Sequence, residues 1–159
     1  MTTKNTDLVA NFEATPQVAN SAAELAGVLR TAHGSVELAA GDSTDNDIVM
    51  LAPIPSNASV PTLFVGSDTF GGSCTFNVGI YTSAGVVKDE DVFATSVADA
   101  AAMADVRYEA ADLNTGSKKL WELAGDSEDP GGYLYVAITF NATGGTAGTL
   151  NWNISYVVN

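Results

Sequence analysis

The amino-acid sequence predicts an all-β fold, an antiparallel β-sandwich with one short helix and an extended N-terminal arm. Segments in which apolar and polar residues alternate recur along the chain, and this period of two is typical of a strand with one buried face. Turn-forming clusters such as "PIPSN", "SDTFGGS" and "NATGGTAG" separate the segments at short intervals. Several short strands at such spacing favour a sandwich or barrel over alternating strands and helices. We expect the sandwich.

Residues 1–27 are predicted to form an N-terminal arm or a first edge strand, and residues 28–159 the sandwich domain. The first segment is rich in Thr, Asn, Ser and Ala, with weak periodicity. Ser21 and Glu24 match a capping box, but Gly27 follows at once, so a helix there has room for at most two turns. An extended conformation is therefore the expectation for this segment.

The first strands of the sandwich are indicated between residues 34 and 66. "GSVELAAG" alternates, with Val36, Leu38 and Ala40 on one face. The continuous apolar run 48–52 is typical of a strand that is buried on both faces. In "SVPTLFVG", Pro61 indicates an edge strand or a strand start, because proline lacks the amide that pairs with a neighbouring strand.

The clearest alternation is "SCTFNVGIYT", residues 73–82. One face of this strand consists of Cys74, Phe76, Val78 and Ile80, and the other of Thr75, Asn77, Gly79 and Tyr81. We expect the first face to pack on the core and the second to lie outside it.

The short helix is predicted in the Ala-rich segment "SVADAAAMAD", residues 96–105. Alanine favours helices, and Ser96 stands three residues before Asp99, as in a capping box. Two further strands follow near the C-terminus, "GYLYVAITF", which is apolar on both faces, and "TLNWNISYVV", which alternates. The apolar face of the last strand is Leu150, Trp152, Ile154, Tyr156 and Val158.

Composition excludes several classes of partner. The chain carries 19 acidic and 6 basic residues, a net charge of −13, and its few bases are scattered. Nucleic-acid binding needs clustered Lys and Arg, so no nucleic-acid partner is expected. No apolar run is long enough to span a bilayer and the N-terminus has no signal-peptide pattern, so we expect a soluble protein without a membrane partner. The single Cys74 excludes an internal disulfide.

The sequence offers no catalytic constellation. His33 is the only histidine, it stands beside a turn signal, and no "GxSxG" elbow is present, so we interpret it as a turn or surface residue. Cys74 lies on the inward face of its strand and is expected to be a small core residue. Zinc needs His or Cys clusters that the chain lacks. We therefore expect no enzyme, no catalytic residue, no cofactor and no metal ligand.

Acidic loops leave calcium open as an alternative. The loop "GDSTDND" holds Asp42, Asp45, Asn46 and Asp47, and "GDSEDPGG" holds Asp126, Glu128 and Asp129. The first does not match an EF-hand loop, and such residues also dominate turns because they bond to the local backbone. The third acidic stretch is "KDED", residues 88–91. Its side chains alternate between two faces, so we interpret it as a solvated sheet edge that discourages pairing between sheets.

The segments "GDSTDNDIVMLAPIPSNASV" and "NVGIYTSAGVVKDEDVFATSV" carry a resemblance to a known family. A strand ending in "IPSNA", an "NVGIY" strand, a turn with Gly and "DxDVFA" together resemble the head decoration, or cement, proteins of tailed bacteriophages. The resemblance covers residues 41–97, about a third of the chain, and none of its motifs is catalytic. It implies a jelly-roll sandwich, often trimeric, on the capsid exterior where capsomers adjoin.

The implied function is that of a virion structural protein whose partners are the major capsid protein and, in a homotrimer, other copies of itself. The resemblance does not identify the residues that touch the shell. The polar arm is the hypothetical contact, because it could lie on the shell or add a strand to a neighbour. Within it, Asn11, Phe12 and Gln17 are our guess for the capsid contacts.

Two other function classes stay open. A receptor- or carbohydrate-binding jelly roll of a fibre or tail would use aromatic side chains such as Trp121, weighed as core packing or partly exposed, and Tyr81. Trp152 lies on the apolar face of its strand and is expected in the core. A small hydrolase is the third class, but the acids show no spacing that pairs two of them.

Overall fold

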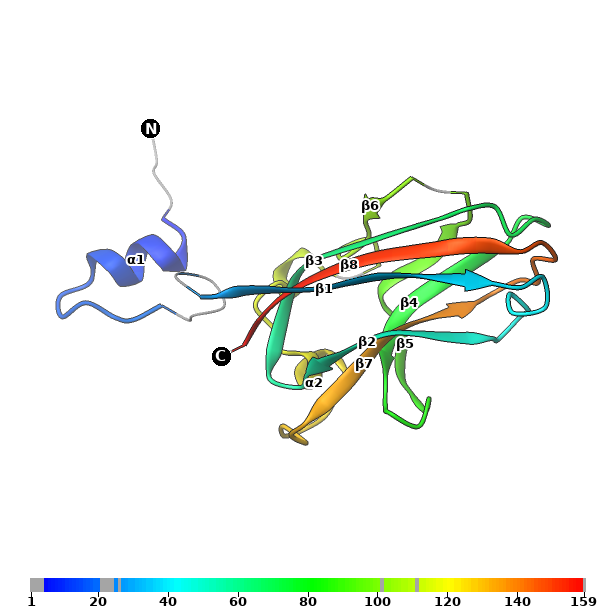
Figure 1. The fold of residues 1–159 in the computed structure, drawn as a ribbon. Helices are drawn as coiled ribbons and strands as arrows, with labels where there is room; N and C mark the ends of the chain where they lie inside the picture. Colours follow the sequence, from blue (N-terminus) through cyan, green and yellow to red (C-terminus); the bar gives the residue numbers. More distant parts are fainter. Residues whose placement is uncertain (1–4, 21–24, 26, 101, 111, 159) are drawn as a thin grey trace.

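Two antiparallel sheets form the body of the protein in this computed structural model, which describes residues 5–20, 25, 27–100, 102–110 and 112–158 (Figure 1). The first sheet has the order β1-β8-β3-β6 and the second the order β2-β7-β4-β5. The first consists of β1 (Leu29–Leu38), β8 (Gly148–Val158), β3 (Ala58–Ser67) and β6 (Ala104–Asp105). The second consists of β2 (Ile48–Pro55), β7 (Tyr133–Phe140), β4 (Thr75–Tyr81) and β5 (Val87–Ala98).

The connections between the strands follow the jelly-roll pattern. Six of the seven successive connections pass from one sheet to the other, and only β4 and β5 are consecutive neighbours within a sheet. This alternation produces two sheets of four strands in which sequence neighbours face each other across the core. The predicted antiparallel β-sandwich is confirmed.

The core lies between the two sheets and is built largely from the alternating residues of their strands. The ring of Phe140 meets those of Phe70 and Phe76 edge to face, with centroids 5.4 Å and 6.1 Å away respectively. Burying one such side chain contributes about 1.5–3 kcal/mol. The strand predicted from "GYLYVAITF" is β7, which lies between β2 and β4 and is buried along most of its length. Its apolar character on both faces reflects this central position.

Three short helical segments accompany the sheets: α1 (Asp7–Glu13), the 3₁₀ turn η1 (Leu113–Thr115) and α2 (Leu120–Leu123). No helix in the described ranges is long and apolar enough to cross a bilayer. α1 lies where an extended arm was expected, so that prediction is wrong for residues 7–13. The capping-box pair Ser21 and Glu24 lies outside the described residues.

The helix predicted for residues 96–105 is wrong. Ser96 and Val97 belong to β5, and Val97 pairs with Phe76 of β4. Asp99 does not cap a helix, because its carboxylate accepts hydrogen bonds from the backbone amides of Phe70 (2.7 Å) and Gly71 (3.1 Å). Pairing with β4 and this long-range turn contact override the local helix preference of alanine.

Two predictions about strand position hold only in part. Leu51 and Ala52 of the run 48–52 are buried, but Ile48, at the start of the edge strand β2, is 39% exposed. Pro61 is the fourth residue of β3 and does not start the strand; β6 pairs only with Phe64 and Val65 of β3, so no β6 residue pairs with Pro61. It stands where the register with β8 shifts, between Ser59 and Thr62, and such an irregularity accommodates a residue that cannot donate.

The second face of β4 is covered, contrary to the expectation that it would lie outside the core. Its Asn77, Gly79 and Tyr81 are all buried. The cover comes from β5. Asp89 pairs with Ile80 and Ala94 pairs with Val78, so six residues of β5 lie opposite three residues of β4. The "KDED" edge is thus a bulge that folds over Gly79, where a Cβ would lie 2.1 Å from the backbone oxygen of Asp89.

Candidate functional site

The N-terminal arm, defined here as residues 5–20, is a small folded unit beside the sandwich (Figure 1). α1 is followed by a segment that returns along it. The side-chain amide of Asn20 donates to the backbone oxygen of Leu8 (3.2 Å), and the backbone amide of Val18 donates to the backbone oxygen of Asn11 (3.1 Å). A further side-chain bond joins Asn5 and Glu13 (3.1 Å). These contacts give the arm a defined shape without help from the sheets.

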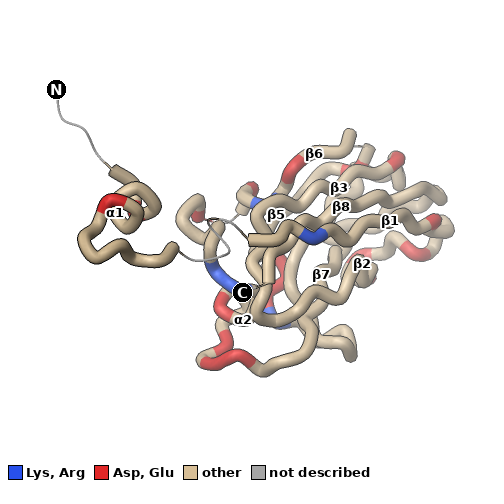
Figure 2. The backbone as a smooth tube through the Cα atoms, turned by 60° about the vertical axis from the view of Figure 1, so that its left-hand side comes forward, with Lys and Arg blue, Asp and Glu red and all other residues tan. Residues whose placement is uncertain are grey.

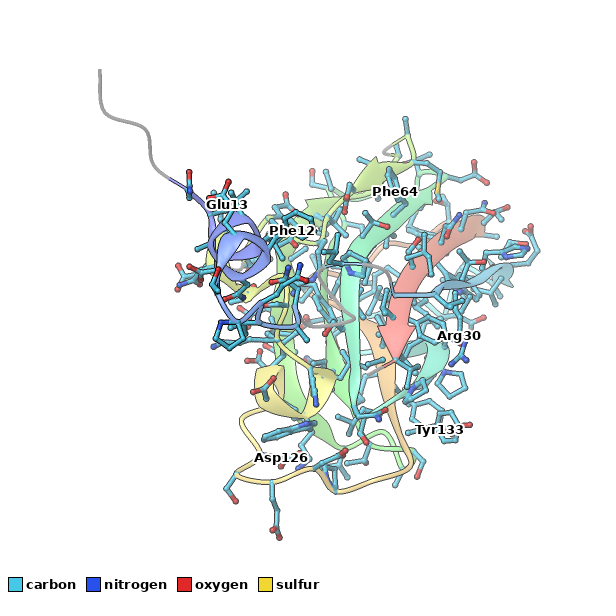
Figure 3. All side chains as sticks on the ribbon, turned by 90° about the vertical axis from the view of Figure 1, so that its left-hand side faces the viewer. Phe12, Glu13, Arg30, Phe64, Asp126 and Tyr133 are labelled. Carbon is cyan, nitrogen blue, oxygen red and sulfur yellow. The ribbon has the colours of Figure 1, made fainter. Side chains whose placement is uncertain are left out.

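No residue of α1 is buried, so the arm has no core of its own. Its apolar side chains Val9, Phe12 and Val18 are exposed, and Phe12 is exposed to 67%. Figure 3 shows α1 at one end of the molecule, with Phe12 and Glu13 projecting from it. Exposed apolar side chains on a folded segment that lacks a core are typical of a surface that packs on a partner.

The three guessed contact residues have different environments within the arm. Phe12 and Gln17 are exposed. Asn11 is half-buried, and its amide donates to the side-chain oxygen of Asn20 (2.9 Å). Asn11 therefore helps to fold the arm, while Phe12 is the side chain with the largest apolar area free for a partner.

A hollow of about 350 Å³ lies between β5, the loop before η1, and α2. Its lining includes Asp89, Asp91, Asp112 and Glu122, together with Lys118. Burial raises the pKa of Asp89 above its ordinary value. The Glu122 carboxylate accepts from the Lys119 amide (2.8 Å), and that of Asp91 from the Thr95 hydroxyl (3.3 Å).

Asp89, Asp91 and Glu122 accept hydrogen bonds from nearby residues of their own segments. No group of three or more His, Cys, Asp or Glu side chains in the described part of the chain is placed to hold a metal ion.

In the two acidic loops that left calcium open, the acidic side chains bond to their own turns and to residues of other segments. Asp42 accepts from the Ala39 amide (2.9 Å), and Asp47 from the Thr44 amide (2.8 Å). Asp129 accepts from the Ser56 hydroxyl (2.5 Å) and the Gly131 amide (2.9 Å). The Ser56 hydrogen bond, followed by the Gly131 amide, lowers the pKa of Asp129. The preference of these residues for turns accounts for Asp42 and Asp47, whereas in the second loop Asp126 also pairs with Lys88 (2.6 Å) and Asp129 with Ser56.

The residues weighed for nucleophilic chemistry lie apart. Cys74 is buried as expected, its thiol contacts the Ala142 oxygen at 3.1 Å, and burial, followed by the charge of Asp99, raises its pKa. His33 is exposed as expected, but it lies inside strand β1 and not beside a turn. A buried thiol with a raised pKa is a poor nucleophile, because the reactive form is the thiolate.

The aromatic residues named for carbohydrate binding do not form a platform. Tyr81 is fully buried, which corrects the expectation that it is exposed, and its hydroxyl bonds to Thr139. Burial raises the pKa of Tyr81. Trp121 and Trp152 are half-buried and pack against the core. Stacking on a sugar ring needs an exposed aromatic face, which Tyr81 does not offer.

Sequence reasoning gave no role to Arg107, which is fully buried. Its guanidinium donates to the backbone oxygens of Val60 (2.6 Å) and Thr115 (2.9 Å) and lies over the rings of Phe93 and Tyr108. Burial lowers its pKa. The residue ties β3 to β5 and to η1, and nothing in the local pattern "DVRYEA" distinguishes it from a surface arginine.

No protein-family model matches the chain, and no curated protein sequence matches it. Among solved structures, the chain is similar to one in the capsid asymmetric unit of cyanophage Pam1, with 16% identity and a TM-score of 0.44. That likeness covers 84% of this chain and 86% of the other.

A second similar chain belongs to the acidic stable capsid structure of Helicobacter pylori bacteriophage KHP30. It has 13% identity, a TM-score of 0.33, and coverage of 82% and 94% of the two chains. Both TM-scores lie below 0.5, and neither likeness carries a conclusion about function.

Proposed function

We propose that this chain is a structural protein of a phage virion, a decoration or cement protein that binds the head exterior and bridges neighbouring capsomers. The proposal rests first on the resemblance of residues 41–97 to such proteins. Its partners are the major capsid protein and other copies of the chain in a homotrimer. The role is structural, and the proposal includes no catalytic step.

The structural observation that supports the proposal most is the arm. It is folded by its own hydrogen bonds, yet α1 buries no residue. A segment of this kind loses little conformational freedom on docking, because much of its shape exists beforehand. Phe12 is the anchor that the proposal assigns to the shell, since buried aromatic side chains dominate the energetics of interfaces.

Several arms that dock together bind the shell more tightly than a single arm. The arm is small, so one docked copy gains little affinity by itself. When copies are linked in a trimer, the second and third arms bind at a high effective concentration, and the whole assembly binds far more tightly than one arm. A trimer on a three-fold position of the shell uses this directly.

The test measures decoration of particles that lack this protein. Purified full-length chain, the chain without residues 2–20, and Phe12→Ala are added to such particles, and the bound copies per particle are counted. Deletion is expected to abolish binding, and Phe12→Ala to weaken it by at least about tenfold. Leu113→Ala is the matched control, because Leu113 on η1 is 83% exposed and lies outside the arm.

Undiminished occupancy by the deleted chain would refute the role of the arm. Failure of the full-length chain to bind any particle would refute the decoration function itself. If Phe12→Ala and Leu113→Ala weaken binding to the particles equally, the loss of binding is not specific to Phe12, and Phe12 is not the anchor.

A further inference from the structure

The outer surface of the first sheet carries an ordered patch of uncharged side chains. Three rows run across β1, β8 and β3, because paired residues of adjacent strands lie side by side on the same face. The rows are Thr31–Ser155–Thr62, His33–Asn153–Phe64 and Ser35–Asn151–Gly66. We call these nine residues the neutral face.

The neutral face is open to solvent and its polar groups are available. Every β1 member, Asn151 and Asn153 are exposed, and Phe64 is exposed to 37%. No hydrogen bond within the described part of the chain uses the side chains of His33, Asn151 or Asn153. Met103 lies against the same strands, where it lines a shallow hollow of about 370 Å³ with His33 and Asn153. The patch therefore combines free amide groups with exposed apolar area.

The absence of carboxylates from this patch is unusual for a chain of net charge −13. β8 and β3 carry no charged residue along their whole length. Figure 2 shows both strands without acidic or basic positions. The acidic residues of the described part lie in loops and on α1, β1, β5, β6 and α2. The nearest acids flank the patch: Glu37 and Asp68 lie beyond one end, and Asp105 lies beside Phe64.

We infer that the neutral face is the surface through which copies of this chain associate with one another. Two copies with a charge of −13 repel, and repulsion between exposed charges extends over about 8 Å at physiological ionic strength. Contact through the neutral face keeps the acids of both copies at its rim, where water and salt screen them. Loss of charge from the centre, with Phe and Met enriched there, is also the composition that distinguishes interface cores from other surfaces.

A second copy fits this surface better than a saccharide. Sugar recognition uses aromatic rings with an open face; Trp152 lines the hollow but packs against the core, which leaves Phe64 as the exposed ring of the patch. Around a three-fold axis each contact is heterologous, so one half of the neutral face of one copy meets the other half of that face on the next copy. The inference deepens the proposed function and rests on it only for the number of copies.

The test is sedimentation equilibrium of the full chain from nanomolar to high micromolar concentration, with Asn153→Asp as the variant. The substitution keeps the size of the side chain and adds a negative charge at the centre of the patch in every copy. Asn114→Asp is the matched control, because it adds the same charge at an exposed position on η1. We expect wild type and N114D to form the same oligomer, and N153D to dissociate at least about tenfold more readily.

Thermal unfolding of the N153D monomer establishes that the fold is intact. Assembly of N153D like wild type, equal weakening by N114D, or a wild type that stays monomeric throughout would each overturn the inference. A monomeric wild type that binds a glycan array through Asn153 would assign the face to a saccharide instead. No capsid is present in this measurement, so its failure would leave docking of the arm to the shell untouched.

Discussion

Gly79→Ala is the substitution that most directly tests the bulge of β5 over β4. A Cβ at residue 79 would lie 2.1 Å from the Asp89 oxygen and 2.3 Å from the Glu90 carbonyl carbon. Ordinary contacts of a Cβ begin near 3.4 Å, so the backbone of β5 must move by roughly 1 Å to admit it. Both clashing groups are backbone, and no rotation of a side chain relieves them.

The expected cost is at the upper end of the range for overpacked cores, about 3 kcal/mol of unfolding free energy. For a chain of 159 residues, that loss corresponds to a fall in the unfolding midpoint of about 6–12 °C. The assay is calorimetric unfolding, with a urea titration of the same samples for the free energy. The hollow between β5, the loop before η1 and α2 is expected to rearrange as well, since Asp89 and Asp91 line it.

Gly41→Ala is the matched control. A Cβ at residue 41 meets no atom within 4 Å, and its backbone lies outside the left-handed region. Its stability is expected to stay within about 1 kcal/mol of wild type, because an unstrained Gly-to-Ala change mainly restricts the unfolded chain. If Gly79→Ala is as stable as Gly41→Ala, the bulge does not cover β4 and this account of the "KDED" segment is wrong.

Three further substitutions or treatments test other parts of the structure. Because burial raises the pKa of Asp89, its charged form disfavours folding, and this penalty is relieved as the pH falls through the raised pKa towards the ordinary value. Asp89→Asn should therefore be more stable than wild type at pH 7 and equally stable at a pH of about 3, where the carboxyl is neutral in the folded and the unfolded chain. A difference in unfolding midpoint that is the same at both pH values would contradict this. Arg107→Ala leaves the backbone oxygens of Val60 and Thr115 without donors and should cost at least about 2 kcal/mol, measured by urea titration against Lys118→Ala. An Arg107 variant as stable as that control would refute the role of the guanidinium. Cys74 should react with a disulfide reagent only when the chain unfolds, and rapid labelling of native protein would show that the thiol is accessible.

The core-facing residues of the strands were predictable from their own spacing. Phe76, Val78 and Ile80 recur with the period of a strand, and their common burial follows from that period alone. Burial of β7 along most of its length was likewise indicated by its apolar residues on both faces. These features are local, so the alternation carries them without knowledge of the partners.

The errors arise where a distant segment decides the outcome. Tyr81 has the alternation of an outward residue, yet it is buried because β5 bulges over that face. The Ala-rich segment after Ser96 has a helical preference, yet its first residues pair with β4 and Asp99 binds the turn at Phe70. Arg107 gave no signal, because the groups that satisfy it come from β3, β5 and η1.

The candidate site was predictable only as a location. Weak periodicity and polar composition indicated an arm or a first edge strand for residues 1–27. The helix α1 and its return segment depend on side-chain bonds of Asn5, Asn11 and Asn20, which no periodic pattern reveals. The guess of Asn11 as a contact illustrates this, since its amide bonds within the arm.

Electron microscopy of purified virions tests the proposed function most directly. The account predicts jelly-roll density on the outside of the head at local three-fold positions, with the arm lying on neighbouring capsid subunits. Copies should meet through the neutral face. Density confined to the tail or a fibre, or particles that contain the chain without any density on the head exterior, would contradict the account.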